Sequence, residues 1–405
     1  MFNRTLIIVA SAIVFFACNN KQQSEKIDLR TAPWENILKE AEGSSVNFVM
    51  WQGSSIQNDY INNFVVPKVK EYYNIDLKIS GGQGPEIVQL IMGEKQAGTT
   101  KGQSDMVWIN GETFFQLNQI DGLWGPFVDQ LPNTKYIDFS DTFISTDFQQ
   151  PINGMECPWA ITQFAFGYDT AKVKNPPKNL MELEVYLIAN PGTFTISNDF
   201  TGMSLLKTFL AEISGSSTGL DGKYEEGKYQ TLSDSLWNWI NRNKKYFWKE
   251  GSTFPKEHSK MDQLYASGEL NITYGFNEGG VETKTLQGLF PKTSRVYPWD
   301  NGTVKNANYL GISYNAANKA GAMTVINFLV SPEAQLKRMN TEKISGNTVL
   351  SMEKLSGEWK SKFKAVPKRI YGANLEELEN HAIREPSPKY MLKLYEEFRT
   401  QVIEK

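Results

Sequence analysis

The feature that most constrains the fold is a regular alternation of short apolar runs with longer stretches of helical spacing. Three runs have the length and character of strands: 46–51 (VNFVMW), 75–80 (IDLKIS) and 105–109 (DMVWI). Between the first two runs, apolar residues recur at helical spacing until Pro67 interrupts them. Between the last two, Pro85 opens a second helical stretch. This βαβαβ order predicts a parallel sheet with right-handed crossovers.

A second series of the same kind begins near Trp159. Its expected strands are 159–169 (one strand or a pair), 192–196, 269–275 and 307–315. Its expected helices are 179–189, 200–213, 319–330, a further helix after the Ser331-Pro332 cap, and a terminal helix striped by Met391, Leu394, Tyr395, Phe398 and Val402. The two series predict an α/β protein of two lobes, each a mixed, mostly parallel sheet flanked by helices, with a cleft between the lobes.

The chain is expected to pass between the lobes twice, around residues 156–166 and around residues 297–309. These crossings give the following organisation: 1–17 signal peptide, 18–33 tether, 34–158 first part of lobe 1, 159–300 lobe 2, and 301–405 return to lobe 1 with the C-terminal helices. The tether is polar and lacks apolar periodicity, as a flexible linker does.

The N-terminal residues predict export. One cation, Arg4, precedes an apolar core that ends at Ala17 and is too short to span a bilayer as a helix. The sequence FFAC, ending at Cys18, resembles the lipobox of bacterial lipoproteins. This resemblance implies lipidation of Cys18 and a periplasmic or cell-surface protein anchored to a bacterial membrane. Ordinary secretion remains an alternative, because Phe is bulkier than the usual residue at the first two lipobox positions.

Composition excludes several kinds of function. The formal charge is −3 and the chain has no basic cluster, which argues against a nucleic-acid partner. Only two histidines are present, His258 and His381, each in a polar neighbourhood, so a His-based zinc site or a His-assisted nucleophile is not expected. Cys157 is the one cysteine besides Cys18. We therefore expect no metal, no cofactor and no catalysis.

Four polar loops are expected to face one another across the cleft, because each lies where an apolar run gives way to a helix. They are residues 51–54 (WQGS), 110–112 (NGE), 198–202 (NDFTG) and 275–279 (GFNEG). Their amides, hydroxyls, rings and carboxylates suit binding, and no convergent base or nucleophile accompanies them. The alternative for each acid is that it only caps a helix, and for each ring, including Trp108, that it belongs to the core.

Three motifs invite other interpretations. Residues 222–228 (GKYEEGK) have phosphate-loop spacing, but Tyr229 stands where Ser or Thr is needed and no apolar strand leads in. Residues 80–85 (SGGQGP) are adequately explained as a turn. Cys157 lies at an expected crossing, where it is either a nucleophile assisted by Glu156 or Glu278 or a small buried thiol, and the buried thiol is the simpler interpretation.

Over nearly all of its length after the signal, the chain resembles the extracellular solute-binding proteins of bacterial ABC importers, specifically the YnjB-like family. The resemblance rests on Trp34 with ILKEAEGSSVNFVMWQGS, and on EKQAGTTKGQSDMVWINGETF, GPFVDQLPN, DFQQPINGMECPWAITQ, ANPGTFTISNDFTGMSLLK, LYASGELNITYGFNEGG and ANYLGISYNAANKAGAMTVINFLVSPEAQLKRM. It implies a monomeric two-lobed fold of the type II periplasmic-binding-protein kind. Such a fold closes on its ligand and hands it to a permease driven by an ATPase.

The resemblance and the loops together give the candidate ligand-binding residues: Trp51, Gly53, Ser54, Asn110, Glu112, Gln163, Asp199, Thr201, Asn277 and Glu278. A ferric ligand is not expected, because Tyr72 and Tyr73 are adjacent on a helix and point in different directions. The acids and rings favour a small cationic or heteroaromatic solute. Two alternatives stay open: a thiaminase-like enzyme on the same fold that uses Cys157, and a ligand-binding sensor for a membrane receptor.

Overall fold

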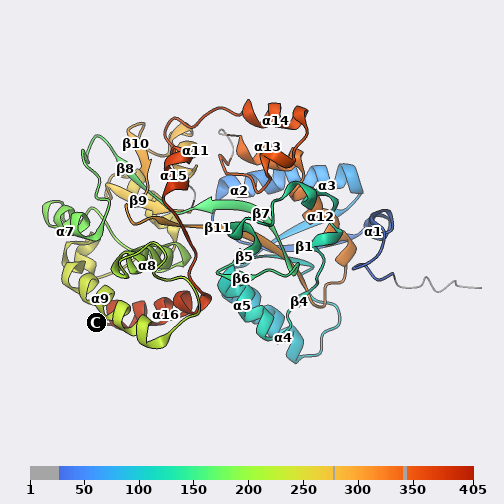
Figure 1. Cartoon of the computed structure of the whole chain (residues 1–405), viewed down its shortest axis with the longest axis horizontal. Coiled ribbons are helices and arrows are strands. Elements are labelled where there is room, and N and C mark those ends of the chain that lie inside the picture. Colours follow the sequence, from blue (N-terminus) through green and yellow to red (C-terminus); the bar gives the residue numbers. More distant parts are fainter. Residues whose placement is uncertain (1–26, 277–278, 341–343) are drawn as a thin grey trace, which may run out of the picture.

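The computed structural model describes residues 27–276, 279–340 and 344–405, which form two halves built around two sheets (Figure 1). The larger sheet has the order β12-β11-β3-β1-β2, with β4 and β7 also paired to β11. Its strands are β1 (Ser45–Met50), β2 (Asp76–Gly81), β3 (Met106–Ile109), β4 (Leu123–Trp124), β7 (Glu156–Gln163), β11 (Thr303–Ser313) and β12 (Ala382–Arg384). The smaller sheet consists of β8 (Ala165–Asp169), β9 (Ile272–Gly275) and β10 (Ser294–Tyr297), and a separate hairpin joins β5 (Thr146–Asp147) to β6 (Gln150–Pro151).

The α-helices, in chain order, are α1 (Trp34–Ala41), α2 (Ser55–Tyr60), α3 (Val66–Tyr73), α4 (Gly84–Gln96), α5 (Gly111–Gln119), α6 (Thr142–Ser145), α7 (Leu180–Ala189), α8 (Phe200–Ile213), α9 (Glu226–Asn243), α10 (His258–Ala266), α11 (Gly280–Leu286), α12 (Lys319–Leu329), α13 (Pro332–Met339), α14 (Gly357–Lys364), α15 (Leu375–Asn380) and α16 (Pro388–Phe398). Single 3-10 turns are η2 (Val128–Gln130), η3 (Pro132–Tyr136), η4 (Lys244–Tyr246), η5 (Trp248–Gly251) and η6 (Met352–Lys354), and π-helical turns are η1 (Ile61–Val65) and η7 (Arg399–Ile403). None of the helices in this part of the chain is long and apolar enough to cross a membrane.

The first βαβαβ series is confirmed. Strand β1 pairs in parallel with β2 on one side and with β3 on the other, so that Phe48 lies opposite both Ile79 and Met106. Helix α4 begins as its sequence indicates, because Gln83 and Glu86, on either side of Pro85, form a capping box. The carboxyl ends of β1 and β3 therefore lie beside each other, with α2 and α5 following them.

Pro67 does not end its helix, contrary to expectation. Helix α2 continues through the π-helical turn η1 into α3, and Pro67 lies in the first turn of α3. A π turn adds a residue to the helical winding. The extra residue changes the backbone hydrogen bonds next to Pro67, which has no N–H to donate. The helical winding therefore continues across Pro67.

The smaller sheet differs from the mostly parallel arrangement expected for each lobe. Strand β8 is central and antiparallel to both neighbours, with Phe166 opposite Tyr297 and Tyr274. Residues 192–196, expected as a strand, form no ladder, although Phe194 and Ile196 are fully buried. This segment is held by isolated bonds instead, such as the Asn271 N–H to the Thr193 carbonyl (3.0 Å), so its apolar pattern reflects burial alone.

Strands β7 and β11 are antiparallel neighbours that connect the two halves. The chain leaves the larger sheet after Gln163 and enters the smaller one at Ala165, and it returns between Tyr297 and Thr303. Residues 159–163, expected in lobe 2, stay in the larger sheet because β7 pairs with β11 along its length. The lobe boundaries themselves remain a prediction.

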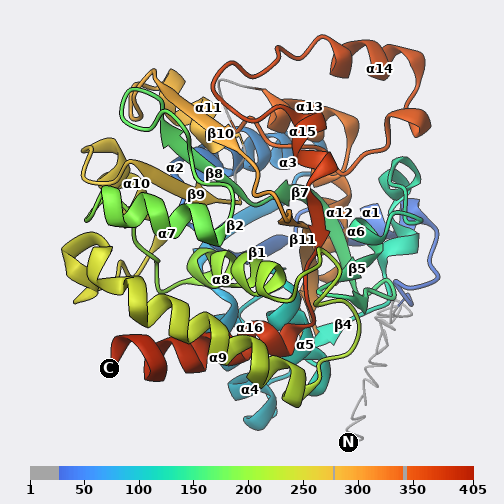
Figure 2. The same cartoon turned by 60° about the vertical axis from the view of Figure 1, so that its left-hand side comes forward.

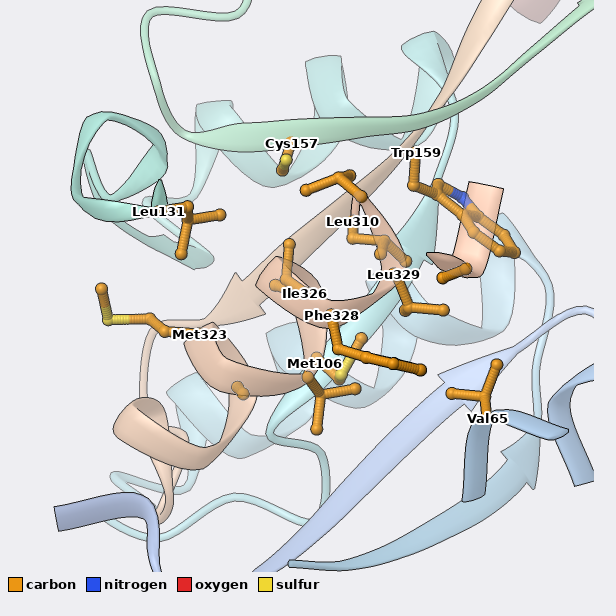
Figure 3. Close-up of a cluster of buried hydrophobic side chains, with 14 of the residues drawn as sticks. Val65, Met106, Leu131, Cys157, Trp159, Leu310, Met323, Ile326, Phe328 and Leu329 are labelled. Atoms are coloured by element: carbon orange, nitrogen blue, oxygen red, sulfur yellow. The ribbon is translucent and has the colours of Figure 1, made fainter. Parts of the chain in front are cut away.

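Each half has its own apolar core. In the larger half, Trp159, Leu310 and Phe328 belong to one cluster between the sheet and helix α12 (Figure 3). The core of the smaller half contains Phe209 and Trp239, and it also contains residues of the C-terminal helix α16, including Met391 and Leu394. Figure 2 shows α16 with α8 and α9, so the chain ends on the smaller half.

Candidate functional site

The turn from β3 into α5 presents Asn110, Gly111 and Glu112 at the edge of the larger half. Asn110 occupies the N-cap position without a side-chain capping bond. A Cβ on Gly111 would lie 2.2 Å from the Phe148 ring, so only glycine allows the hairpin β5–β6 to rest on this turn. The first turn of α5 is thus fitted to the hairpin.

The hairpin directs Phe148 into the smaller half. Phe148 and Gln149 have φ values of 43° and 62°, and two consecutive positive φ values are typical of a type I′ turn. The Tyr309 hydroxyl fixes the base of the hairpin, 2.9 Å from the Ile144 carbonyl and 3.0 Å from that of Thr146. As a result, the Phe148 ring is 1 % exposed and belongs to the core of the smaller half.

A row of aromatic rings continues from this hairpin through the smaller half. The Phe148 ring centroid lies 6.4 Å from that of Phe200, Phe200 lies 5.5 Å from Phe276, and Phe276 lies 5.4 Å from Phe164. The row connects the hairpin, the start of α8 and the end of β9. Three of the four expected loops, those at 110–112, 198–202 and 275–279, therefore meet through side chains of the described residues.

The start of α8 is organised by Asp199. Its carboxylate accepts the Gly202 N–H (3.0 Å) and the Ser197 hydroxyl (2.7 Å). A Cβ at Gly202 would lie 1.6 Å from the Ser197 carbonyl oxygen, so this turn requires glycine. Asp199 is therefore a helix cap, the alternative that the sequence left open, and its charge still lies at this end of the helix.

A buried ion pair lies about two turns further along α8. The Lys207 ammonium donates to Glu385 Oε2 at 2.6 Å, and the Asn306 amide donates to Glu385 Oε1 at 3.0 Å. Lys207 is 1 % exposed. The same ammonium lies 4.3 Å from the ring centroid of Phe148 and 5.4 Å from that of Phe200. Cation–π attraction therefore adds to the ion pair.

Two further carboxyls face this ion pair, and we call Glu112, Asp147 and Glu385 together with Lys207 the carboxylate cluster. Burial raises the pKa of Glu112 to about 7, while a backbone bond and Lys207 act in the opposite direction. Burial also raises the pKa of Asp147 well above its usual range, and the charges of Glu112 and Glu385 add to this effect. Among the described residues, neither Asp147 oxygen nor Glu112 Oε2 has a hydrogen-bond partner.

A line of side-chain hydrogen bonds runs along β7 and β11 and ends at Glu385. The Trp108 indole N–H donates to Asn308 (3.2 Å), Asn308 donates to Thr162 (3.4 Å), and Thr162 donates to Asn306 (3.2 Å), which binds Glu385. Trp51 packs edge-on against Trp108, with ring centroids 6.2 Å apart. This line links the 51–54 loop to the carboxylate cluster across the two connecting strands.

The remaining candidate residues have structural partners of their own. Gly53 lies under the Trp51 ring, where a Cβ would be 2.4 Å from a ring atom. Ser54 caps α2 by accepting the Gln57 N–H (3.3 Å). Gln163 is buried and donates to the Leu378 carbonyl (2.7 Å) and to the Thr303 hydroxyl.

Thr201 lies in the first turn of α8 beside Asp199. Asn277, Glu278 and the proposed lipidation site Cys18 lie outside the described residues.

The sequence does contain a signal for Lys207. Lys207 is the one charged residue within the run GMSLLKTFLA, and a lysine buried in such a helix requires an anionic partner. Asp147 and Phe148 lacked a comparable signal, because their hairpin consists of two two-residue strands. Glu385 follows β12 and is distant in sequence from every residue it binds.

Cys157 belongs to the core of the larger half (Figure 3). It is fully buried, and burial raises the pKa of its thiol. Its sulfur contacts the Pro158 carbonyl oxygen at 3.7 Å. These properties are those of a structural thiol rather than a nucleophile. Among the described residues, no three His, Cys, Asp or Glu side chains are grouped to hold a metal ion.

Comparison with known proteins gives both family and fold relatives. The model of a family described as bacterial extracellular solute-binding protein matches residues 65–365. Protein YnjB of Escherichia coli (strain K12) is 31 % identical over 326 residues, which are 80 % of this chain and 84 % of that protein.

Solved structures share the fold at low identity. The periplasmic binding protein AfuA from Actinobacillus pleuropneumoniae, with fructose-6-phosphate bound, matches with a TM-score of 0.62 at 13 % identity, covering 89 % of this chain and 98 % of that one. A putative spermidine/putrescine ABC transporter from Listeria monocytogenes matches with a TM-score of 0.60 at 15 % identity, covering 88 % and 98 %. The α/β fold with two halves is thus the one expected from the sequence.

Proposed function

Because the chain belongs to the bacterial extracellular solute-binding proteins, we propose that it captures a small solute between its two halves and delivers it to an ABC permease and its ATPase. The observation that carries this proposal is that side chains from both halves meet in the carboxylate cluster, Glu112 from α5 and Lys207 from α8. A solute that contacts both halves favours the state in which they are together, and release requires them to separate.

The proposed moving bodies are the lobes expected from the sequence, 34–158 with the return from 301 onward, and 159–300, with two changes: residues 159–163 stay with the larger sheet, and the C-terminal helix α16 belongs to the smaller half. Their connections are short, since the chain crosses at Phe164, between Tyr297 and Thr303, and again between Arg384 and Pro388. Short connections between two separate cores suit a hinge. Helix α16 would move with the smaller half, because Met391 and Leu394 belong to its core.

We propose a cationic or heteroaromatic solute. Glu112 and Asp199 supply negative charge beside the row of aromatic rings, and Trp51 is 37 % exposed, so part of its ring is open to contact. The further candidate contacts Gly53, Ser54, Asn110, Thr201, Asn277 and Glu278 remain part of this proposal. Gln163 is the weakest member, because its amide already binds Leu378 and Thr303.

We also propose that Cys18 is lipidated and anchors the protein to a bacterial membrane. The substitution Cys18→Ser should release the protein into the soluble fraction of the cell envelope without changing solute affinity. A Cys18→Ser protein that remains membrane-bound would contradict the anchor and leave solute binding unaffected.

Native mass spectrometry of protein purified without refolding tests the function. We expect a retained small molecule with a cationic or heteroaromatic group, and a weaker complex in Asp199→Asn. Asparagine caps a helix about as well as aspartate, so this variant removes charge while keeping the fold. A retained anion or plain sugar would contradict the solute class. Failure to retain any solute, or to bind one from a cell extract, would contradict the function.

A binding role without turnover is tested at Cys157. Cys157→Ser should retain the solute and should release it chemically unchanged, as the wild type does, because the thiol is enclosed by the core. A modified solute formed by the wild type but not by the variant would instead support the enzyme alternative.

A further inference from the structure

The carboxylate cluster is buried and contains three carboxyl groups but only one positive charge, that of Lys207. Glu385 is fully engaged, with Lys207 on one oxygen and Asn306 on the other. Asp147 is 1 % exposed and Glu112 is 8 % exposed, yet three of their four oxygens have no partner among the described residues. An ionised carboxylate buried in this way costs several kcal/mol unless a donor or cation joins it.

The surroundings of the cluster already hold one nitrogen cation. The Lys207 ammonium lies over the Phe148 ring at 4.3 Å and within 5.4 Å of the Phe200 ring, while it binds Glu385. Rings and a carboxylate together are a favourable environment for an alkylammonium group. Asp147 immediately precedes Phe148, so its free oxygens lie at the same hairpin tip.

We propose that the carboxylate cluster is a subsite for a second cation, the ammonium or amidinium group of the bound solute, with Asp147 as its main contact and Glu112 as its second. The inference rests on the proposed function and specifies the chemistry of its site. An organic cation is proposed because the Phe148 and Phe200 rings beside the carboxyls suit an alkylammonium group. Lys207 is already paired with Glu385, so Glu112 and Asp147 are the carboxyls left to balance the charge of the solute.

The subsite lies at the junction of the halves. Asp147 and Glu112 belong to the hairpin and to α5, whereas Lys207 and Phe200 belong to α8. A cation held by Asp147 and Glu112 of the larger half would be attracted on the other side by the Phe200 ring of the smaller half, and the low exposure of both carboxyls means that it could enter only when the halves separate. Binding and closure are therefore linked through this group.

Protonation of the subsite competes with the cation of the solute. Burial raises the pKa of Glu112 to about 7, so part of this group is protonated at neutral pH and a cation would displace the proton, and burial shifts the pKa of Asp147 in the same direction. Other titratable groups within electrostatic range are Glu156 on β7, Tyr309 on β11 and Tyr395 on α16. Solute binding at pH 7 should accordingly release protons, which calorimetry in buffers of different ionisation enthalpy measures.

The test uses the full chain and the substitution Asp147→Asn, which keeps size and removes charge. Asp129→Asn, at an exposed position in η2, is the matched control. Native mass spectrometry records the solute retained by each protein, and a thermal-shift titration compares methylammonium chloride with sodium chloride at equal ionic strength. We expect methylammonium to raise Tm in the wild type and control only, and solute affinity to fall about 10- to 100-fold in Asp147→Asn.

The outcomes separate this inference from the function on which it rests. Equal retention of one solute by the wild type and Asp147→Asn, or retention of a neutral or anionic solute, would overturn the subsite and leave solute binding intact. Equal Tm shifts in both proteins would also overturn it. A wild type that binds no solute would overturn both proposals. If Asp147→Asn fails to fold, Glu112→Gln replaces it with the same expected loss.

Discussion

At the scale of single residues, Lys207 is the group on which the junction between the halves most depends. Its ammonium is the one cation of the carboxylate cluster, and it binds Glu385 at 2.6 Å with both side chains almost fully buried. Removing one partner of such a pair leaves the other charge buried without compensation. We therefore infer that the pair fixes the geometry of the junction between the halves and adds little to the net free energy of unfolding.

Lys207→Met should lower the free energy of unfolding by about 3–5 kcal/mol at pH 7, because Glu385 would be left unpaired. The double variant Lys207→Met/Glu385→Gln should recover much of this loss, since the buried charge is then absent as well. Chemical denaturation of the three proteins measures both effects. A double variant no more stable than Lys207→Met would show that lost packing, not charge, explains the change.

Glu112 predicts an unusual pH dependence of stability. Its pKa is about 7 in the folded chain and near the ordinary value of 4.5 when unfolded. The folded state therefore binds the proton more tightly, and stability falls as pH rises from about 4.5 to about 7. Glu112→Gln should remove this fall, which amounts to about 3 kcal/mol at most. Urea denaturation at pH 5 and pH 8 tests this, with the exposed Glu40→Gln as control. An equal pH dependence in wild type and Glu112→Gln would contradict it.

At the scale of elements, the β5–β6 hairpin is small but connects the two cores. It starts from the larger half, where Tyr309 holds its base, and its Phe148 ring completes the core of the smaller half. Its position depends on Gly111, which leaves room for the ring. The hairpin is therefore a contact that forms or breaks with the relative position of the halves.

Phe148→Ala should lower the free energy of unfolding by about 3–5 kcal/mol, the range for a fully buried Phe. It should also weaken solute binding, because the hairpin tip would no longer pack against Phe200 and Lys207. The half-buried Phe143→Ala, in the same segment but outside the core of the smaller half, is the control. Full affinity in Phe148→Ala would show that the hairpin does not contribute to the bound state.

The elements differ in how well sequence predicted them. Helix α4 and the helix after Ser331 carry their start signals within a few residues, so both were predicted closely. The direction of β8 depends on which strands return beside it, and no local signal specifies that. Residues 192–196 have the apolar pattern of a strand because they are buried, although they form no ladder.

The same reasoning applies to the candidate site. The loops at strand ends, including the one that contains Glu112, could be predicted because each lies where an apolar run gives way to a stretch of helical spacing. Asp147, Lys207 and Glu385 come from three separate segments, and only the fold brings them together. The excess of carboxyl groups over lysine, on which the proposed chemistry depends, exists only after folding and cannot be seen in any one segment.

At the scale of the whole molecule, the two halves are joined by short crossings and by contacts that include buried, raised-pKa carboxyls. Deprotonation of these groups places like charges at the junction. Water would stabilise those charges if the halves separated, so the position of the halves is coupled to pH.

Without solute, the radius of gyration should therefore be larger at pH 8 than at pH 5.5, because Glu112, whose pKa is raised to about 7, loses its proton across this range. Small-angle X-ray scattering measures the change, and circular dichroism checks that the helix content stays constant. The double variant Glu112→Gln/Asp147→Asn should show a smaller difference between the two pH values. An unchanged wild-type radius would mean that the junction tolerates the charges without opening.

The edge-to-face contacts of Trp51, Trp108 and Trp159, with centroid separations of 6.2 and 5.0 Å, give the protein a built-in optical probe. Trp159 is enclosed, whereas Trp51 is partly open to water. A molecule that covers Trp51 would shift its emission to the blue, and the adjacent indoles would share that excitation. Occupancy could then be followed by intrinsic fluorescence, with no dye attached.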